Sequence, residues 1–343
     1  MTTSDSVTVR FEHARAVVTV VGEPGTSRLV TVQPHQADLR IQRSPCRTRY
    51  PDALIARLLE VKGPEYVCDE IARDEDPSYA EINIDLGLFS YLRADEFAGK
   101  RLLDFGCGCG SSTMILARRL PATTIVGVEL VPESLEVARL RARHYGRDDI
   151  VFRASPDGNT LPADLGQVDF IVMNAVFEHL LPAERRPVMA QLWSALRPGG
   201  VLFMQETPNR WCPVEMHTTG LPLLNYAGDG LAHRLARRYS RRVAPAGTWE
   251  GLLRDGIRGG SVREILGTLP ASQGRPELLR PIVPGLAGQA DLWYRASARR
   301  HGASTPKNVV RVCLKAARAL TTLDFTPELI LAVRKRGAGP VAQ

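Results

Sequence analysis

The sequence of 343 residues lacks a long apolar run and a closely spaced pair of cysteines. Its longest apolar stretch near the N-terminus, residues 16–21, is far shorter than the ~20 residues that a membrane-spanning helix needs. The first residues also lack the basic and then apolar pattern of a secretion signal. The six cysteines, at positions 46, 68, 107, 109, 212 and 313, contain no C-x-x-C motif, which argues against a metal site and favours a reducing compartment. We therefore expect a cytoplasmic protein with no bound metal and no membrane span.

The charge of the chain does not identify its partners. Lys and Arg number 44 against 37 Asp and Glu, so the formal net charge is +7 at pH 7. A mildly basic surface suits acidic partners, but basic residues that are spread along the whole chain do not identify one. A chain of this length holds about two domains, or one enlarged α/β domain.

Three alternating glycines follow the clearest buried-strand pattern in the chain. Residues 102–112 read Leu-Leu-Asp-Phe-Gly-Cys-Gly-Cys-Gly-Ser-Ser, with glycine at positions 106, 108 and 110. Glycine tolerates positive φ and lets backbone N–H groups approach a ligand, and the N-terminus of a following helix points its positive end at the same place. The segment therefore predicts a strand, a ligand-binding turn and a helix, with a nucleotide-like ligand over the turn.

Two acidic residues narrow the choice of ligand. Asp104, at the end of the predicted strand, would repel a diphosphate over the glycines but attract a sulfonium or ammonium group. The turn also lacks the last glycine of the dinucleotide fingerprint G-x-G-x-x-G, because position 111 is serine. Glu129 ends a second apolar run, where an acid can accept hydrogen bonds from both ribose hydroxyls. These residues favour S-adenosylmethionine over NAD as the cofactor.

Four further segments complete a resemblance to a known family. They are residues 151–162 with Asp157, residues 168–179 with Asn174, the run Leu-Arg-Pro-Gly-Gly-Val-Leu-Phe at 196–203, and residues 329–335. With the glycine turn they resemble the class I, Rossmann-like, S-adenosylmethionine-dependent methyltransferases over residues 80–206 and 325–336. The resemblance implies a doubly wound, mostly parallel α/β sheet of the seven-stranded type, with an antiparallel last strand. It also implies that Asp157, one residue later than in the family pattern, contacts the adenine amino group.

The glycine turn and the resemblance together define the candidate cofactor-binding residues. These are Asp104, Phe105, Gly106, Cys107, Gly108, Gly110, Glu129, Leu130, Asp157 and Asn174. Asn174 is followed by Ala-Val-Phe, whereas enzymes of this fold that methylate exocyclic amines carry Pro-Pro-aromatic at this place. That difference disfavours a DNA or RNA amino-methyltransferase.

Segments outside the core predict an N-terminal extension and an insertion. Residues 7–42 alternate loosely between apolar and polar side chains, which predicts short strands, and residues 52–93 have the broad apolar faces of helices. Residues 207–325 are rich in Arg, Gly and Pro, show no sheet pattern and contain helical segments at 231–242, 249–253, 261–266 and 306–320. We expect a mainly helical cap over the carboxyl ends of the strands, enclosing the second substrate. The predicted units are residues 1–50, 51–206, 207–325 and 326–343.

Three titratable residues are candidates for a catalytic base. His217, in a Pro-rich loop directly after the fifth strand, is the preferred base, and Glu178 and His179 follow the fourth strand. A base helps when the acceptor is a hydroxyl, although alignment of the acceptor with an activated methyl group can supply most of the rate. Each residue also has a structural interpretation, because loop residues of these types often only hold their loop by hydrogen bonds.

The preferred function is methylation, at oxygen, of a small molecule or of a sugar or lipid-linked biosynthetic intermediate. A second hypothesis is an RNA or other nucleic-acid methyltransferase, because five arginines cluster on one predicted helix: Arg234, Arg237, Arg238, Arg241 and Arg242. The absence of an RNA-binding module and of interleaved aromatic residues argues against nucleic acid. A third hypothesis is a non-catalytic protein that binds the cofactor and uses its cap as an interaction surface. No feature of the sequence predicts an oligomeric state.

Overall fold

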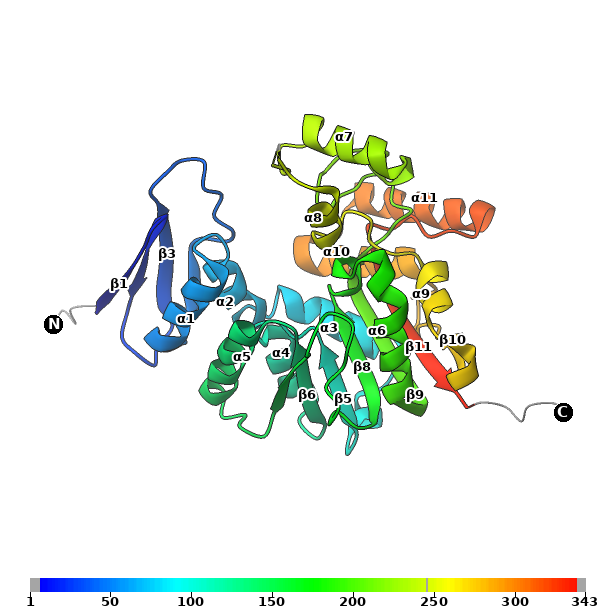
Figure 1. The fold of residues 1–343 in the computed structure, drawn as a ribbon, viewed down its shortest axis with the longest axis horizontal. Helices are drawn as coiled ribbons and strands as arrows, with labels where there is room; N and C mark the ends of the chain where they lie inside the picture. The colour runs from blue at the N-terminus through cyan, green and yellow to red at the C-terminus, as the bar shows by residue number, and fades with distance from the viewer. Residues whose placement is uncertain (1–6, 245, 338–343) are drawn as a thin grey trace.

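The protein contains two β-sheets of different kinds. The computed structural model describes residues 7–244 and 246–337, and Figure 1 shows their arrangement. A seven-stranded sheet with helices on both faces forms the centre, and a four-stranded sheet lies at one side. A mainly helical layer lies across one end of the central strands.

The central sheet is mostly parallel, which confirms the predicted fold class. Its strand order is β10-β11-β9-β8-β5-β6-β7, and β11 alone among the described strands of this sheet runs in the direction opposite to the others. The strands are β5 (Arg101–Phe105), β6 (Thr124–Glu129), β7 (Val151–Ala154), β8 (Val168–Asn174), β9 (Leu196–Pro208), β10 (Arg275–Leu278) and β11 (Glu328–Arg336). The order reverses between β5 and β8, and ligands of open α/β sheets bind beyond the carboxyl ends of the strands at such a point.

Helices cover both faces of the central sheet. Successive side chains of a strand point to opposite faces, so Leu102 of β5 lies in one core and Leu103 in the other. The first core includes α3 (Ala80–Phe89), α4 (Ser111–Arg119), α5 (Pro132–His144) and α10 (Gln289–His301). The second includes α6 (Pro182–Ala195) and α9 (Val262–Thr268). Coverage of both faces is typical of parallel sheets and leaves the strand ends for binding.

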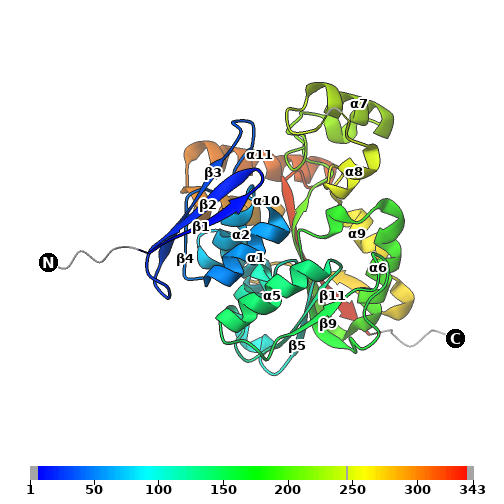
Figure 2. The ribbon, with the colours of Figure 1, turned by 60° about the vertical axis from the view of Figure 1, so that its left-hand side comes forward.

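A four-stranded antiparallel sheet precedes the central one. Its strands are β1 (Thr8–His13), β2 (Ala16–Val21), β3 (Arg28–Pro34) and β4 (Cys46–Thr48), and the first three lie within the region of loose alternation. Val18 and Val20 of β2 are fully buried in a core shared with α1 (Asp52–Lys62) and α2 (Val67–Glu75), and Figure 2 shows the sheet beside these helices. The sheet therefore has one buried face, as expected for an antiparallel sheet at the side of a domain.

The insertion between β9 and β11 is mainly helical but also contributes a strand. Besides α9 and α10 it contains α7 (Asp229–Tyr239), α8 (Trp249–Arg254) and α11 (Thr305–Thr321). The expectation of no sheet pattern in this region was wrong at β10, and α10 was not predicted. β10 reads Arg-Pro-Glu-Leu, which carries no alternation signal, and an edge position tolerates both its proline and its charges. The boundaries at residues 50, 206 and 325 stay predictions.

Neither the helices nor the cysteines of residues 7–244 and 246–337 indicate a membrane or an oxidising setting. No helix there combines the length and the apolar character that a bilayer crossing needs. The six cysteines form no disulfide, and Cys68, Cys107, Cys109 and Cys212 are buried. The cytoplasmic location stays a prediction.

Trp193 joins α6 to the edge of the central sheet. Its side chain is fully buried, and its indole N–H donates to the carbonyl of Gly274, directly before β10, at 2.9 Å. The ammonium of Lys335 on β11 donates to the Trp193 carbonyl and lies 5.8 Å from the centre of the indole ring.

We predict that Trp193→Ala lowers the free energy of unfolding by about 3–5 kcal/mol, the usual cost of removing a large aromatic side chain from a core. Trp193→Phe should cost less, because it loses the hydrogen bond but keeps most of the buried apolar surface. Urea denaturation of the two variants and the native protein measures both effects. Equal stability of Trp193→Ala and the native protein would contradict this packing.

Candidate active site

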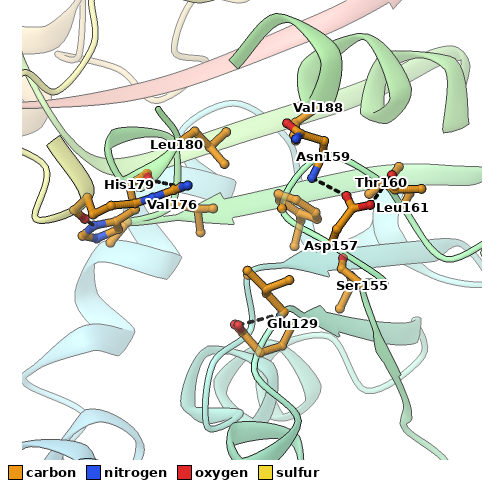
Figure 3. Close-up of a pocket in the computed structure, with 17 residues that line it drawn as sticks. Glu129, Ser155, Asp157, Asn159, Thr160, Leu161, Val176, His179, Leu180 and Val188 are labelled. Atoms are coloured by element: carbon orange, nitrogen blue, oxygen red, sulfur yellow. Dashed lines mark hydrogen bonds between the residues drawn. The ribbon is translucent and has the colours of Figure 1, made fainter. Parts of the chain in front are cut away.

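A cavity of about 490 Å³ lies at the carboxyl ends of β5, β6, β7 and β8, a volume within the usual range for ligand pockets. Figure 3 shows His179 at one side of it and Asp157 at the other. The lining residues are Phe105, Gly106, Val128, Glu129, Leu130, Ser155, Asp157, Gly158, Asn159, Thr160, Leu161, Ala175, Val176, His179, Leu180, Val188 and Arg254. The cavity therefore occupies the place that the strand order predicts for a ligand.

The glycine turn after β5 is held against the end of β6. The N–H groups of Gly106 and Cys107 both donate to the carbonyl of Val128, at 2.8 and 3.0 Å. Gly106 has φ +74°, and a Cβ built on it would lie 2.5 Å from Cγ2 of Val176 in the loop after β8. Glycine is required here for two reasons, the left-handed backbone and the close approach of Val176.

Glu129 connects the turns that follow β5 and β6. One carboxylate oxygen accepts a hydrogen bond from the N–H of Gly108 at 2.9 Å. The other accepts from the N–H groups of Leu130 at 2.7 Å and Val131 at 3.0 Å. A carboxylate has about four acceptor positions, so three N–H groups leave it room for a ligand hydroxyl at the cavity wall.

Asp104 lies beneath the glycine turn and not in the cavity wall. It is 1% exposed, and one of its oxygens accepts hydrogen bonds from the hydroxyls of Ser112 at 2.8 Å and Thr113 at 2.6 Å. Burial raises its pKa to about 6, against the effect of the two hydroxyls, and the nearby Glu129 raises it further. Asp104 is therefore largely ionised at pH 7, and its negative charge lies directly beneath the glycine turn.

Asp157 organises the loop that follows β7. Its carboxylate accepts from the N–H of Asn159 at 2.7 Å and from the hydroxyl of Thr160 at 3.1 Å. These hydrogen bonds, the one from Asn159 first, hold the pKa of Asp157 below its usual value. The side chain is exposed in the cavity wall and its lowered pKa favours the ionised form, so it can accept a hydrogen bond from an amino group of a ligand.

The predicted cofactor-binding residues divide into two groups. Phe105, Gly106, Glu129, Leu130 and Asp157 line the cavity. The other five do not line it: Asp104, Cys107, Gly108, Gly110 and Asn174. The Cys107 thiol is buried, and that burial raises its pKa well above the usual value. Gly110 begins α4 with φ +83° and packs against Ala138 of α5. The side-chain amide of Asn174 donates to Glu206 at 3.2 Å.

Sequence reasoning missed several residues of the wall. Val176, Leu180 and Val188 read as ordinary apolar residues of a loop and a helix. Arg254 comes from α8 in the insertion and pairs with Glu184 of α6 at 2.5 Å. No local pattern could have identified Arg254, because its place in the wall depends on how the insertion folds back.

The three residues predicted to be catalytic lie together, and His179 among them lines the cavity. Ligand atoms of Glu178, His179 and His217 all lie within 4.8 Å of one another, although the loops that carry them are far apart in the sequence. Glu178 is 0% exposed, and neither of its carboxylate oxygens has a hydrogen-bond partner among the described residues. Burial raises the pKa of Glu178 to about 8, and the nearby Glu206 and Glu328 add to this increase.

A hydrogen bond to the insertion fixes the imidazole of His179. Its Nδ1 lies 2.5 Å from the carbonyl of Arg254. Since a carbonyl only accepts, Nδ1 carries the hydrogen, and Nε2 of the neutral ring keeps a free lone pair. That Nε2 lies 3.9 Å from a carboxylate oxygen of Glu178.

His217 approaches the same point from the loop after β9. Its backbone N–H donates to the buried carboxylate of Glu215 at 3.0 Å. The centre of its imidazole ring is 5.9 Å from that of His179. A Cβ on Gly256 of the insertion would lie 2.8 Å from Cδ2 of His217 and 3.0 Å from Cγ of Glu178, so all three are closely packed. Burial, and then the neighbouring His179, lower the pKa of His217, which favours the neutral ring.

His217 also lines a second cavity, of about 260 Å³, together with Glu328. A third cavity shares Glu328 and Met216 with the second and contains Glu206 in its wall. Burial and the proximity of Glu206 raise the pKa of Glu328 to about 7. His179 thus borders the cavity at the glycine turn, and His217 borders the second cavity. Glu178 lies beside both histidines.

The model of a family described as methyltransferase domain matches residues 103–202, the segment that builds the glycine turn and strands β5 to β9. The chain carries a class I S-adenosylmethionine-dependent methyltransferase domain. This confirms the predicted family and its cofactor. The family model stops before the insertion, so the match says nothing about the acceptor.

Relatives match the methyltransferase domain over part of their length. Carboxy-S-adenosyl-L-methionine synthase of Chromohalobacter salexigens is 35% identical over 144 residues, 40% of this chain and 50% of that protein. Trans-aconitate 2-methyltransferase of Methylobacterium radiotolerans is 29% identical over 203 residues, 59% of this chain and 63% of that protein. The chain thus spans about half the length of the first of these relatives.

Solved structures resemble the chain less closely. The YcgJ protein of Bacillus subtilis is 16% identical with a TM-score of 0.43, and the match covers 76% of this chain and 99% of that one. TrmN of Thermus thermophilus is 28% identical with a TM-score of 0.29, over 32% of this chain and 34% of that one. The strand order of the central sheet itself establishes the fold class of the methyltransferase domain.

We predict that Gly106→Ala destabilises the protein more than Gly108→Ala does. Both positions have positive φ, which costs a non-glycine residue about 1–2 kcal/mol. Only at position 106 does the new Cβ also meet Val176, whereas nothing lies within 4 Å at position 108.

Removing the γ-methyl groups of Val176 should relieve this contact. The double variant Gly106→Ala/Val176→Ala should therefore lose less stability than the sum of its two single variants. Thermal or urea unfolding of the four proteins measures this coupling. Strict additivity would show that the two residues do not meet.

Proposed function

We propose that this protein transfers a methyl group from S-adenosylmethionine to a hydroxyl oxygen of a small molecule, including a sugar or lipid-linked intermediate. The observation that carries the proposal is the position of Glu178, His179 and His217 between the cavity at the glycine turn and the second cavity. A donor in the first cavity and an acceptor in the second would meet at these three residues.

The lining of the first cavity suits S-adenosylmethionine. Glu129 has acceptor capacity for the ribose hydroxyls, and the ionised Asp157 is available to an amino group of the adenine. The buried negative charge of Asp104 beneath the turn favours a ligand with a net positive charge. When bound, the cofactor supplies an activated methyl group on a sulfonium.

The residues at the end of this cavity can activate a hydroxyl. Nε2 of His179 has a free lone pair directed to the cluster, because its Nδ1 hydrogen is held by the Arg254 carbonyl. His217 is buried and favours the neutral form, which can accept a proton. The insertion packs against these residues through Arg254 and Gly256.

The charged residues of the second and third cavities favour a neutral or cationic acceptor over a polyanion. Glu215 and Glu328 line the second cavity together with Arg258. Glu206 lies in the wall of the third cavity, 3.2 Å from Arg300. A phosphate backbone would be repelled by this surplus of carboxylates. The small-molecule interpretation is therefore preferred to the nucleic-acid hypothesis.

The affinity for S-adenosylmethionine should rise as the pH increases from 5 to 7. Asp104 has a pKa of about 6, so its charged form, which attracts the cationic ligand, becomes dominant across this range. Asp104→Asn should bind about ten-fold more weakly at pH 7 and lose this pH dependence, since one charge-assisted interaction is worth about 1.4 kcal/mol or more. Calorimetric titration at several pH values measures both effects. Parallel pH profiles of the two proteins would contradict the role of Asp104.

Transfer of a labelled methyl group in a cell extract tests the function directly. Mass spectrometry should find a small hydroxyl compound that gains the label only when the native protein is present. The His179→Asn/His217→Asn variant should lose most of this activity while it still binds the cofactor. Label found only in nucleic acid, or cofactor binding without labelling of any compound, would overturn the proposal in favour of the second or third hypothesis.

A further inference from the structure

We propose that Glu178, His179 and His217 form a binding site for one divalent transition-metal ion. One ligand atom from each residue lies within 4.8 Å of the other two, and the residues come from two distant loops. The sequence predicted no metal site, because that prediction considered the cysteines. The present site uses imidazole and carboxylate ligands, which the fold brings together.

The state of Glu178 is the first independent support. Its side chain is 0% exposed, and both carboxylate oxygens lack a hydrogen-bond partner in the described part of the chain. Its Oε1 lies 3.9 Å from Nε2 of His179, so the unpartnered carboxylate borders the space between the two histidines. Buried carboxyl groups in proteins normally have a hydrogen-bond partner or coordinate a metal, and the described residues supply no such partner to Glu178.

The hydrogen bond of His179 is the second support. Metal-ligating histidines almost always donate their other ring N–H to a carbonyl or a carboxylate, which fixes the tautomer. Nδ1 of His179 donates to the Arg254 carbonyl at 2.5 Å, and Nε2 is left with its lone pair directed to Glu178. The insertion therefore orients this ring as a ligand.

The surrounding charges favour a cation. Glu206 and Glu328 lie close enough to Glu178 to raise its pKa, and Arg185 is the one guanidinium among the principal influences that acts in the opposite direction. Arg300 faces the same group of carboxylates through its contact with Glu206. Carboxyl groups thus outnumber guanidinium groups around the site, and a bound divalent ion would stabilise their ionised forms.

The ligand set indicates the class of metal. Two imidazoles and one carboxylate suit Zn²⁺, Fe²⁺, Mn²⁺ or Ni²⁺ and leave coordination positions open. Ligand atoms lie about 2.0–2.2 Å from such an ion, so binding would draw the three atoms closer together than they are in the protein alone. The imidazole of His217 makes no hydrogen bond to the described residues, so its rotation is compatible with this movement.

The location of the site suggests its use. His179 lines the cavity at the glycine turn and His217 lines the second cavity, so the open positions of the ion would face an acceptor hydroxyl. A bound cation would lower the pKa of such a hydroxyl, and the carboxylate of Glu328, which also lines the second cavity, would accept the proton in place of the two histidines. This use rests on the proposed methyl transfer, whereas binding of the ion does not.

Metal binding by the full chain tests the proposal. Protein freed of metal with a chelator is titrated with Mn²⁺, with free ion followed by electron paramagnetic resonance, and with Zn²⁺ by calorimetry. We expect one ion per chain, and pulsed measurements on bound Mn²⁺ should detect nitrogen couplings from imidazole. Glu178→Gln, His179→Asn and His217→Asn should each weaken binding at least about ten-fold.

His233→Asn is the matched control, because His233 contacts the Gly247 carbonyl and the ring of Trp249 away from this cluster. It should leave metal binding unchanged. Lack of stoichiometric binding by the native protein, absence of nitrogen couplings, or affinity that survives all three substitutions would overturn the proposal. The nitrogen couplings are measured on the native protein, so the test does not depend on the folding of the variants.

Titration of S-adenosylmethionine into the same samples, together with the labelled-methyl assay, separates this inference from the proposed function. Methyl transfer by protein freed of metal would overturn the proposed use of the ion. Methyl transfer by a protein that binds no added metal would overturn the metal site alone. Metal binding without transfer of a labelled methyl group would overturn the proposed function alone.

Discussion

The carboxylate of Glu129 fixes the site, because it accepts backbone N–H groups from two loops at once. Gly108 after β5 and Leu130 and Val131 after β6 all donate to it. This arrangement requires β5 and β6 to be parallel neighbours, as their register makes them. The cavity, the exposed acceptor positions and the direction of the glycine turn depend on this one side chain, whose loss would leave three N–H groups without their partner.

The second half of the site depends on the insertion. Arg254 orients His179 through its backbone carbonyl, and Gly256 allows His217 and Glu178 to approach each other. A single segment of the cap therefore positions groups that arise from the loops after β8 and β9. Most residues that line the second cavity belong to the insertion, whereas Glu328 comes from β11 of the central sheet.

Local sequence features predicted the parts of the structure that local forces determine. The glycine turn, the buried strands and the acid at the end of β6 follow from residue types and spacing within a few positions, and the structure confirms the fold class. Arg254 and β10 were missed because their positions follow from tertiary packing. His217 and Glu178 were selected for their chemistry, but their proximity to each other depends on the insertion and could not be predicted from spacing.

Hydrogen–deuterium exchange with and without S-adenosylhomocysteine tests most directly whether the cavity bordered by Glu129 holds the cofactor. The account predicts slower amide exchange in three segments, residues 105–110, 129–131 and 155–161, which belong to different loops but border one cavity. Residues 8–34 of the antiparallel sheet should exchange at the same rate in both samples. Protection confined to the insertion, or no protection in these three loops under saturating ligand, would contradict the account.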